Sequence, residues 1–193
     1  MVESYSSKSA GYYENNESQY GKYGVLYNWC AAVDTFYAAG SQPELANEAG
    51  HSSTMFWYVT IPAGNRRGIC PEGWHVPTDE EWTKLTTSAG VGVGSGGTGG
   101  GKLAGGCDWR ESPNATAPGN YSYTDRNSTG FSALPAGGYN GSSFSGVGDG
   151  AYFWSSTTIG NYSVYSRYFD YNGEYLDGLN SREYGFPVRC VRD

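Results

Sequence analysis

The stretch Tyr152–Asp193, YFWSSTTIGNYSVYSRYFDYNGEYLDGLNSREYGFPVRCVRD, combines framework residues with a candidate contact surface. Phe153-Trp154 opens the framework, and Phe186–Val191 is expected to close it as a terminal strand. From Tyr152 to Tyr184, 20 of 33 residues are Tyr, Ser, Asn, Gly or Asp, and none is Lys. Tyrosine gives rigid contact area at little entropic cost, while Ser, Gly and Asn adapt their hydrogen bonds, as in antibody loops. A β-meander without a ligand has the same composition, because Tyr favours strands and the others favour turns.

The composition of the whole chain indicates one loop-rich domain that contains strands. A chain of 193 residues can bury one sizeable core, and only 16% of its residues are charged, whereas Gly numbers 30 and Tyr 18. The net charge of −7 comes without a basic stripe, so we expect no nucleic-acid partner. No apolar run reaches the length of a membrane span, so we expect no membrane insertion.

The chain divides into a polar arm and a single domain. Residues 1–20 are expected to form a loose N-terminal arm, and residues 21–193 one domain with a Gly-rich loop at 90–106, where 10 of 17 residues are glycine. Tyr23–Trp29 is expected to be the first strand, with Val25, Tyr27 and Trp29 on one face. A short helix is expected within Asp34–Ala49, and Met55–Ile61 is an apolar run of either strand or helix.

The clearest local signal is a helix start in Cys70–Trp82, CPEGWHVPTDEEW. Thr78 is a good N-cap, and Glu81 three residues later completes a capping box. Asp79, Glu80 and Glu81 carry negative charge where the helix dipole favours it. We therefore predict a helix from Thr78 or Asp79 to about Ala89, with Trp82 and Leu85 facing the core.

Further strands are predicted towards the C-terminus. Residues 130–138, GFSALPAGG, indicate a short strand and a tight turn, and Tyr152–Ser155 and Tyr162–Tyr171 indicate two more strands. Alternation within Tyr162–Tyr171 places Arg167 and Phe169 inward, with Tyr168 and Asp170 outward.

The sequence contains weak matches to catalytic and metal-binding motifs. Gly96–Lys102 resembles a phosphate-binding loop, but Leu103 replaces the magnesium-binding Ser or Thr and no apolar strand precedes it. His51 and His75 are the only histidines, too few with scattered cysteines for a zinc site, and we expect a structural role for His75.

Aspartates and cysteines complete the search for chemistry. Asp149, Asp170 and Asp177 could join carbonyls around calcium, but nothing has EF-hand spacing, so no cofactor or metal is predicted. Cys190 is expected to be a buried thiol or half-cystine. The four cysteines, which are Cys30, Cys70, Cys107 and Cys190, permit three disulfide pairings in an oxidising compartment.

Several of these segments together resemble the Fibrobacter succinogenes major paralogous domain. The matching pieces, in family order, are Tyr23–Trp29 (YGVLYNW), Cys70–Trp82, Gly101–Leu103 (GKL), Gly130–Tyr139 (GFSALPAGGY), Tyr152–Thr157 (YFWSST) and Tyr184–Asp193 (YGFPVRCVRD). The resemblance implies a C-type-lectin-like fold of the formylglycine-generating-enzyme type. It implies that the first and last strands pair, and that Cys70 lies near Cys190, or Cys30 near one of them.

The resemblance does not extend to enzymatic activity. The paired active-site cysteines of the formylglycine-generating enzymes have no counterpart, because Tyr152–Tyr184 contains no cysteine. C-type-lectin-like folds also serve as variable proteins of diversity-generating retroelements, in which adenine-directed mutagenesis diversifies the C-terminal segment. Tyr152–Asp193 has the position and composition of such a region, although ordinary family members are Tyr- and Asn-rich here too.

Taken together, the sequence predicts an α+β domain with an antiparallel sheet core, one or two helices and long loops, acting as a non-enzymatic ligand-binding module. The expected ligand is a protein or a glycan, and the expected location is extracellular, on a cell surface or on a phage particle, although the N-terminus shows no signal-peptide pattern. The alternatives are an enzyme related to formylglycine-generating oxidases and a structural part of a bacterial surface assembly. The predicted ligand contacts are Tyr162, Tyr165, Tyr168, Asp170, Tyr171, Asn172, Tyr175, Asp177 and Asn180.

Overall fold

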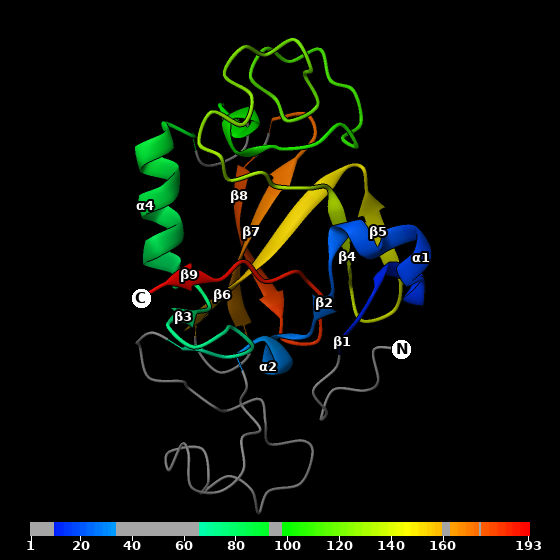
Figure 1. Ribbon diagram of the computed structural model, residues 1–193, viewed down its shortest axis with the longest axis vertical. Helices are drawn as coiled ribbons and strands as arrows, with labels where there is room; N and C mark the ends of the chain where they lie inside the picture. Colours follow the sequence, from blue (N-terminus) through cyan, green and yellow to red (C-terminus); the bar gives the residue numbers. More distant parts are fainter. Residues whose placement is uncertain (1–9, 34–65, 93–97, 160–162, 174) are drawn as a thin grey trace, which may run out of the picture.

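The computed structural model describes residues 10–33, 66–92, 98–159, 163–173 and 175–193 (Figure 1). Its helical elements are η1 (Tyr13–Asn15), α1 (Glu17–Tyr20), η2 (Gly21–Tyr23), α2 (Trp29–Ala32), α4 (Asp79–Ala89) and η4 (Gly100–Leu103). Its strands are β1 (Ala10–Gly11), β2 (Leu26–Tyr27), β3 (Trp74–His75), β4 (Ala136–Tyr139), β5 (Phe144–Val147), β6 (Gly150–Ile159), β7 (Ser163–Asp170), β8 (Tyr175–Ser181) and β9 (Val191–Arg192). The class is α+β, as predicted, while the elements expected within 34–49 and 55–61 lie outside the described residues.

A twisted five-stranded sheet in the order β5-β4-β6-β7-β8 forms the centre of the molecule (Figure 1). Most neighbouring strands are antiparallel, but β4 and β6 are parallel and pair through Gly137 and Ala151. The prediction of an antiparallel core is therefore wrong at this one pair. The reason is the β4–β5 hairpin, because the chain reverses twice before β6 joins the free edge of β4.

Both faces of this sheet are covered by apolar side chains. One face packs against α4 through a cluster that includes Trp82, Phe153 and Phe169. The other face packs against α2 and the C-terminal segment through Trp29, Trp154 and Phe186. Because side chains alternate along a strand, Phe153 and Trp154 of β6 enter opposite clusters. The predicted inward placement of Arg167 and Phe169 is confirmed, since both are almost fully buried.

The helix α4 forms where its sequence predicts. The Thr78 hydroxyl accepts the Glu81 amide at 3.2 Å, and the Glu81 carboxylate accepts the Thr78 amide at 2.8 Å, which confirms the capping box. Gly90 ends the helix with φ of +63°, a conformation that glycine adopts without strain. Trp82 is buried, and Leu85 packs against the same cluster.

The predicted first strand is much shorter than expected. Only Leu26 and Tyr27 are in strand conformation, because Asn28 caps α2 by accepting the Ala31 amide and so turns Trp29 into a helix. Leu26 is nearly fully buried, whereas Tyr27 is half-buried. The expected grouping of Val25, Tyr27 and Trp29 on one strand face is therefore wrong.

The C-terminal segment also differs from the single strand predicted over Phe186–Val191. Phe186 and Tyr27 exchange two backbone hydrogen bonds, so the first strand does meet this segment. Pro187 lacks an N–H and follows this contact directly, and the chain resumes strand pairing only in β9, opposite β3. The strand β8 is not among the strands predicted from the sequence, since Asp177 and Gly178 are residues that favour turns. Its backbone pairing with β7 nevertheless places it in the sheet.

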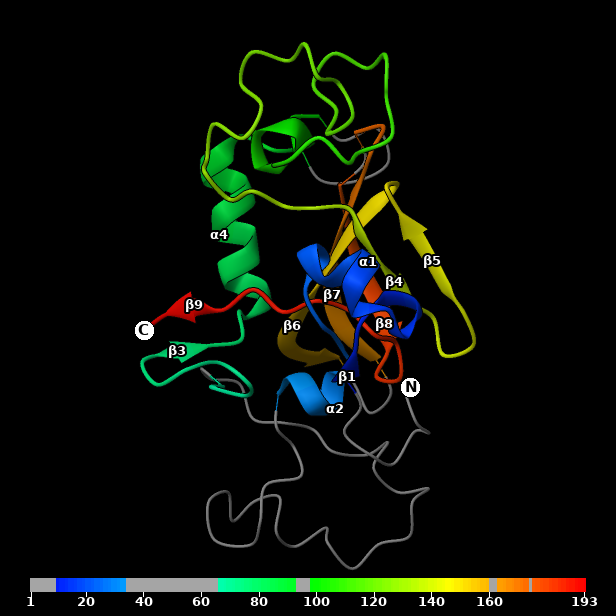
Figure 2. The same ribbon diagram turned by 45° about the vertical axis from the view of Figure 1, so that its right-hand side comes forward.

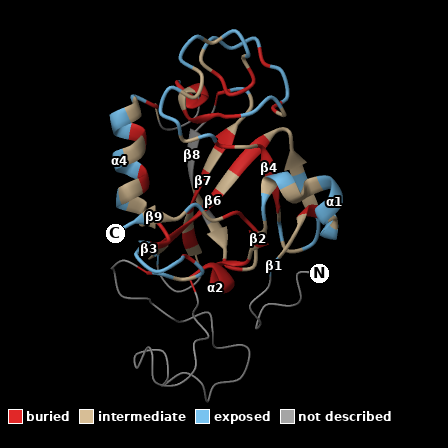
Figure 3. Cartoon of the chain, viewed as in Figure 1, coloured by how far each residue is buried: buried red, intermediate tan, exposed pale blue. Residues whose placement is uncertain are grey.

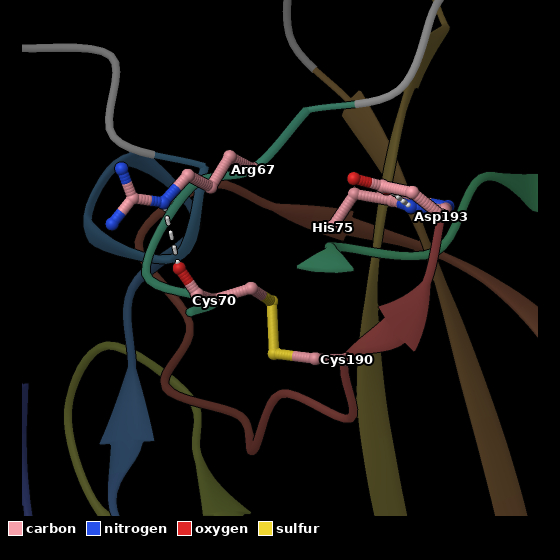
Figure 4. The surroundings of a disulfide bond; sticks show 5 residues. All are labelled: Arg67, Cys70, His75, Cys190 and Asp193. Atoms are coloured by element: carbon pink, nitrogen blue, oxygen red, sulfur yellow. Dashed lines mark hydrogen bonds and ion pairs between the residues drawn. A yellow bond between two sulfur atoms is a disulfide. The ribbon is translucent and has the colours of Figure 1, made fainter. Parts of the chain in front are cut away.

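A disulfide between Cys70 and Cys190 joins the segment before β3 to the segment before β9 (Figure 4). The two Cα atoms are 5.8 Å apart and the residues are separated by 120 positions in sequence. This pairing confirms the proximity that the family resemblance implied. Cys30 is a buried thiol and Cys107 an exposed one.

Two segments predicted to be loose are packed where the structure describes them. In the arm, β1 pairs with β2 and the Tyr13 ring is buried. In the Gly-rich loop, Leu103 is fully buried, and a Cβ atom at Gly101 would lie 2.9 Å from the Ala117 carbonyl oxygen. Glycine at position 101 therefore permits close packing as well as flexibility.

Candidate functional site

The predicted contact residues are distributed along β7, the turn after it, and β8. Tyr165, Tyr168 and Asp170 lie on β7, Tyr171 and Asn172 form the turn, and Asn180 lies on β8. Tyr162 and the side chains of Tyr175 and Asp177 lie outside the described part of the chain. The backbones of Tyr175 and Asp177 pair opposite Phe169 and Arg167.

The structure does not bring the described candidates together on one surface. Tyr165 and Tyr168 are three positions apart on β7, so their side chains point to opposite faces of the sheet. Tyr165 shares the face that α4 covers, whereas Tyr168 shares the other face with Tyr152, its neighbour on β6. The described candidates therefore divide between two faces and one turn.

The turn after β7 is held by the loop that precedes β4. The Asn172 side chain accepts a hydrogen bond from the Ser112 hydroxyl at 2.6 Å, and its backbone carbonyl accepts from Asn114. The Arg110 guanidinium lies 4.9 Å from the centre of the Tyr171 ring. Asp170 accepts the Asn172 amide at 2.7 Å. These interactions give the turn residues a structural role.

A continuous stack of aromatic rings lies on the sheet face opposite α4. Tyr152 is sandwiched between Tyr168, at 4.4 Å between ring centres, and Phe186, at 4.7 Å. Tyr184 meets Phe186 edge to face at 5.9 Å. The Tyr168 hydroxyl donates to the Asp170 carboxylate at 2.9 Å. Each ring position is thereby set by its neighbours.

Burial raises the pKa of two phenols of this stack, those of Tyr152 and Tyr168. Desolvation raises the pKa of the Tyr168 hydroxyl well above its ordinary value, and the neighbouring Tyr152 and Asp170 raise it further. Desolvation also raises the pKa of Tyr152. Both hydroxyls therefore remain neutral hydrogen-bonding groups over the physiological pH range.

A small pocket opens beside this stack, with a volume of about 110 Å³. Its lining comes from β4, β5, β6, β8 and the segment after β8, and includes Tyr139, Asn140, Ser145, Tyr152, Asn180, Tyr184 and Phe186. We call it the tyrosine pocket. It brings one predicted contact residue, Asn180, together with tyrosines that are 13 to 45 positions apart in sequence (Tyr139, Tyr152 and Tyr184).

Some polar groups around the tyrosine pocket are already engaged and others remain open. Asn180 donates its side-chain N–H to the Ser166 hydroxyl at 2.7 Å, which orients the amide. The Tyr139 hydroxyl donates to the Gly141 carbonyl. Within the described ranges, no residue hydrogen-bonds the Asn180 side-chain oxygen or the Tyr184 hydroxyl. The pocket therefore offers an acceptor and a hydroxyl beside apolar rings.

Sequence reasoning missed most of this pocket. Tyr152 and Tyr184 are the limits of the Tyr-rich segment (Tyr152–Tyr184), but neither is among the predicted contact residues. Tyr139 and Ser145 lie far from that segment in sequence and reach it only because β4 and β5 belong to the same sheet. The one available signal was Tyr139, which directly follows the expected strand and turn at 130–138.

His75, on β3, lies between the carboxylates of Asp193 and Glu81. Its Nδ1 is 2.6 Å from Asp193 and its Nε2 is 2.8 Å from Glu81, and only 3% of its side chain is exposed (Figure 4 shows Asp193). Burial alone would lower the pKa of His75, but the hydrogen bonds to Asp193 and Glu81 outweigh it and raise the pKa. With both ring nitrogens engaged and the ring enclosed, the arrangement suits a structural imidazolium.

The raised pKa of His75 predicts a pH-dependent contribution to stability. The contribution is fully present below the unfolded pKa of about 6.5 and is lost as pH rises through the folded value. We expect His75→Gln to destabilise the protein by roughly 1 kcal/mol more at pH 6 than at pH 9. The expected difference is small because the Asp193 carboxylate is largely exposed, so that solvent screens its charge. Urea unfolding of the wild type and of His75→Gln at pH 6 and pH 9 measures this difference in stability. The variant Asp193→Asn should show part of the same pH dependence. A difference that is constant with pH would contradict it.

Two of the aspartates considered for calcium, Asp149 and Asp170, are engaged within the protein, and the side chain of the third, Asp177, lies outside the described residues. Asp149 lies 3.6 Å from Arg110, and Asp170 accepts hydrogen bonds from Tyr168 and Asn172. Across residues that the structure describes, no three His, Cys, Asp or Glu side chains gather so as to hold a metal ion. No helix in the same ranges is long and apolar enough to cross a membrane.

Comparisons with known proteins identify one similarity. The family model described as the Fibrobacter succinogenes major domain matches residues 2–192, nearly the whole chain. No curated protein matches the chain. No solved structure matches it either.

Proposed function

We propose that this chain, which belongs to the Fibrobacter succinogenes major domain family, is a non-enzymatic ligand-binding domain with a C-type-lectin-like fold. The observation that carries the proposal is the tyrosine pocket, where stacked rings stand beside an amide oxygen and a hydroxyl that no described residue hydrogen-bonds. Ligand sites combine apolar walls with a few polar groups in this way. The ligand is a protein or a glycan.

The size of the tyrosine pocket limits what it receives. Sites for whole small molecules measure roughly 300–1,000 Å³, whereas this one measures about 110 Å³. It accommodates one ring-sized group, such as a sugar ring or an amino-acid side chain. The rest of the ligand then lies across the surrounding surface, with the pocket as a central anchor.

The enclosed state of the candidate catalytic groups supports a binding function over an enzymatic one. The Cys190 sulfur is bonded to Cys70 and so offers no thiolate. His75 has both nitrogens engaged by carboxylates. The disulfide also supports a location outside the cytoplasm, because such bonds persist in oxidising compartments, and we propose an extracellular, cell-surface or phage-particle location.

The proposal extends to diversification of the C-terminal segment by a retroelement. Along β7, Tyr165 is half-buried, whereas Arg167 and Phe169 on the same face are buried, so a position open to replacement lies beside positions that hold the core. A nucleotide repeat near the gene, differing only at adenines and sparing the codons of Arg167 and Phe169, is the expected finding. Its absence, together with the absence of a reverse transcriptase gene, removes this part of the proposal.

A binding screen tests the proposed site. We expect the variant Asn180→Ala/Tyr184→Ala to lose at least ten-fold in affinity for a ligand found on arrays of glycans and surface proteins, because truncating anchor residues costs about 2 kcal/mol or more. Trp74→Ala is the matched control, since Trp74 is an exposed aromatic residue on β3, outside the pocket. A chelator should abolish binding only if a calcium-dependent glycan is recognised.

A loss of affinity counts only for a variant that is still folded. Circular dichroism and thermal unfolding establish that the pocket variant remains folded. Equal affinity of the wild type and the folded pocket variant, or an equal loss with Trp74→Ala, would contradict the proposed site.

A further inference from the structure

A second and larger pocket lies on the α4 side of the molecule. Its volume is about 380 Å³, and it is bounded by α4, the loop residue Phe131 and the C-terminal segment that leads into β9. Figure 2 shows α4 above β9, with the C-terminal segment passing the end of the helix. We call it the helix pocket. None of its lining residues belongs to the tyrosine pocket.

The walls of the helix pocket are mainly apolar. Trp82 and Leu85 of α4 form one side, Phe131 another, and Val191 a third. Trp82 and Phe131 meet edge to face at 5.7 Å between ring centres. A volume of this size falls within the range of small-molecule sites, and aromatic walls favour a flat apolar body.

Three charged residues line the helix pocket, and two of them are paired within the protein. Glu81 is committed to His75 and to the Thr78 cap. Lys84 pairs with Glu80 at the exposed surface of α4. The Arg189 guanidinium lies 5.0 Å from the centre of the Phe131 ring, and no ion pair joins it to any residue in the described ranges.

We infer that the helix pocket binds a small organic anion, with a flat apolar body packed against Trp82, Leu85 and Phe131 and its negative group at Arg189. The chain as a whole has a net charge of −7, so an anion gains no general electrostatic attraction and depends on a local cation such as Arg189. Burying apolar area supplies the affinity, and the exposed cation selects the charge.

The disulfide holds one wall of the helix pocket. Cys190 lines the pocket and is tied to Cys70, while the next residue, Val191, pairs with His75 of β3 (Figure 4). The wall is therefore preorganised before a ligand arrives, which lowers the entropic cost of binding.

Two dyes that differ in charge test the inference. Anilinonaphthalene sulfonate has a flat apolar body with one negative group, and phenylnaphthylamine is its neutral analogue. We expect the oxidised wild-type chain to bind the sulfonate saturably and at one site, with amide chemical-shift changes at Leu85 and Val191. We expect Arg189→Gln to weaken the sulfonate roughly two- to five-fold, as for an exposed charge pair, and to leave the neutral dye unchanged.

Arg192→Gln is the matched control, because Arg192 is an exposed arginine three positions away that does not line the pocket. It should bind both dyes as the wild type does. Absence of saturable binding, or shift changes confined to residues outside the helix pocket, would overturn the site. An equal effect of the two substitutions on the sulfonate would overturn the role of Arg189 in selecting an anion.

Discussion

Replacing Cys190 by Ser is expected to lower the free energy of unfolding by about 5 kcal/mol. The cross-link closes a loop of 120 positions, and in the chain-entropy model a loop of roughly 100 residues is worth about 4.7 kcal/mol. For a protein of this size the melting temperature should fall by roughly 10–20 °C, at about 2–4 °C per kcal/mol. Urea unfolding of the oxidised wild type and the variant measures the difference.

A free cysteine provides the control for this effect. Cys107 is exposed and unpaired in the structure, so Cys107→Ser should change stability by no more than about 0.5 kcal/mol. The reduced wild type should resemble Cys190→Ser. A loss below about 1 kcal/mol on removing the cross-link would show that the unfolded chain gains little freedom when the disulfide is absent.

Replacing Arg167 by Met is expected to cost about 2–4 kcal/mol. The guanidinium is fully buried beneath α4, 2.6 Å from the Asp79 carboxylate, and it also donates to the Asp79 carbonyl at 3.0 Å. Breaking a buried ion pair from one side typically costs roughly 3–5 kcal/mol, because the remaining charge loses its partner. The expected loss is smaller here because 29% of the Asp79 side chain is exposed and water solvates the remaining carboxylate.

A double-mutant cycle separates this pair from simple packing. The combined Arg167→Met/Asp79→Asn variant should be destabilised by less than the sum of the single variants, because the second substitution removes the unpaired charge. Lys84→Met is the matched control, since Lys84 forms an exposed pair with Glu80 on the same helix and should cost under about 1 kcal/mol. Additive single effects would contradict an energetic coupling between Arg167 and Asp79.

The helix α4 shows which features could be predicted from sequence. Thr78 and Glu81 are three positions apart, and the interactions that start the helix all lie within that distance. The alternation of Arg167 and Phe169 on β7 was predictable for the same reason, since a strand repeats every two residues. Such features depend on neighbouring residues and need no knowledge of the rest of the fold.

The candidate site was less predictable, because strand pairing decides which tyrosines meet. Composition identified the Tyr-rich segment, but Tyr165 and Tyr168 point to opposite faces and Asn172 is held by Ser112. The tyrosine pocket instead gathers Tyr139, Tyr152 and Tyr184 around Asn180. No spacing within the segment indicates that β4 joins the sheet beside β6.

The residues alone establish the family match, the α4 helix, its cap and the inward side of β7, because each depends on short-range hydrogen bonds, on periodicity or on recognisable motifs. The parallel β4–β6 pair, the β8 edge strand, the enclosure of His75 and the two pockets depend on the three-dimensional arrangement of the chain. They arise from contacts between segments far apart in sequence, whose free energy depends on burial and pairing that no single segment contains.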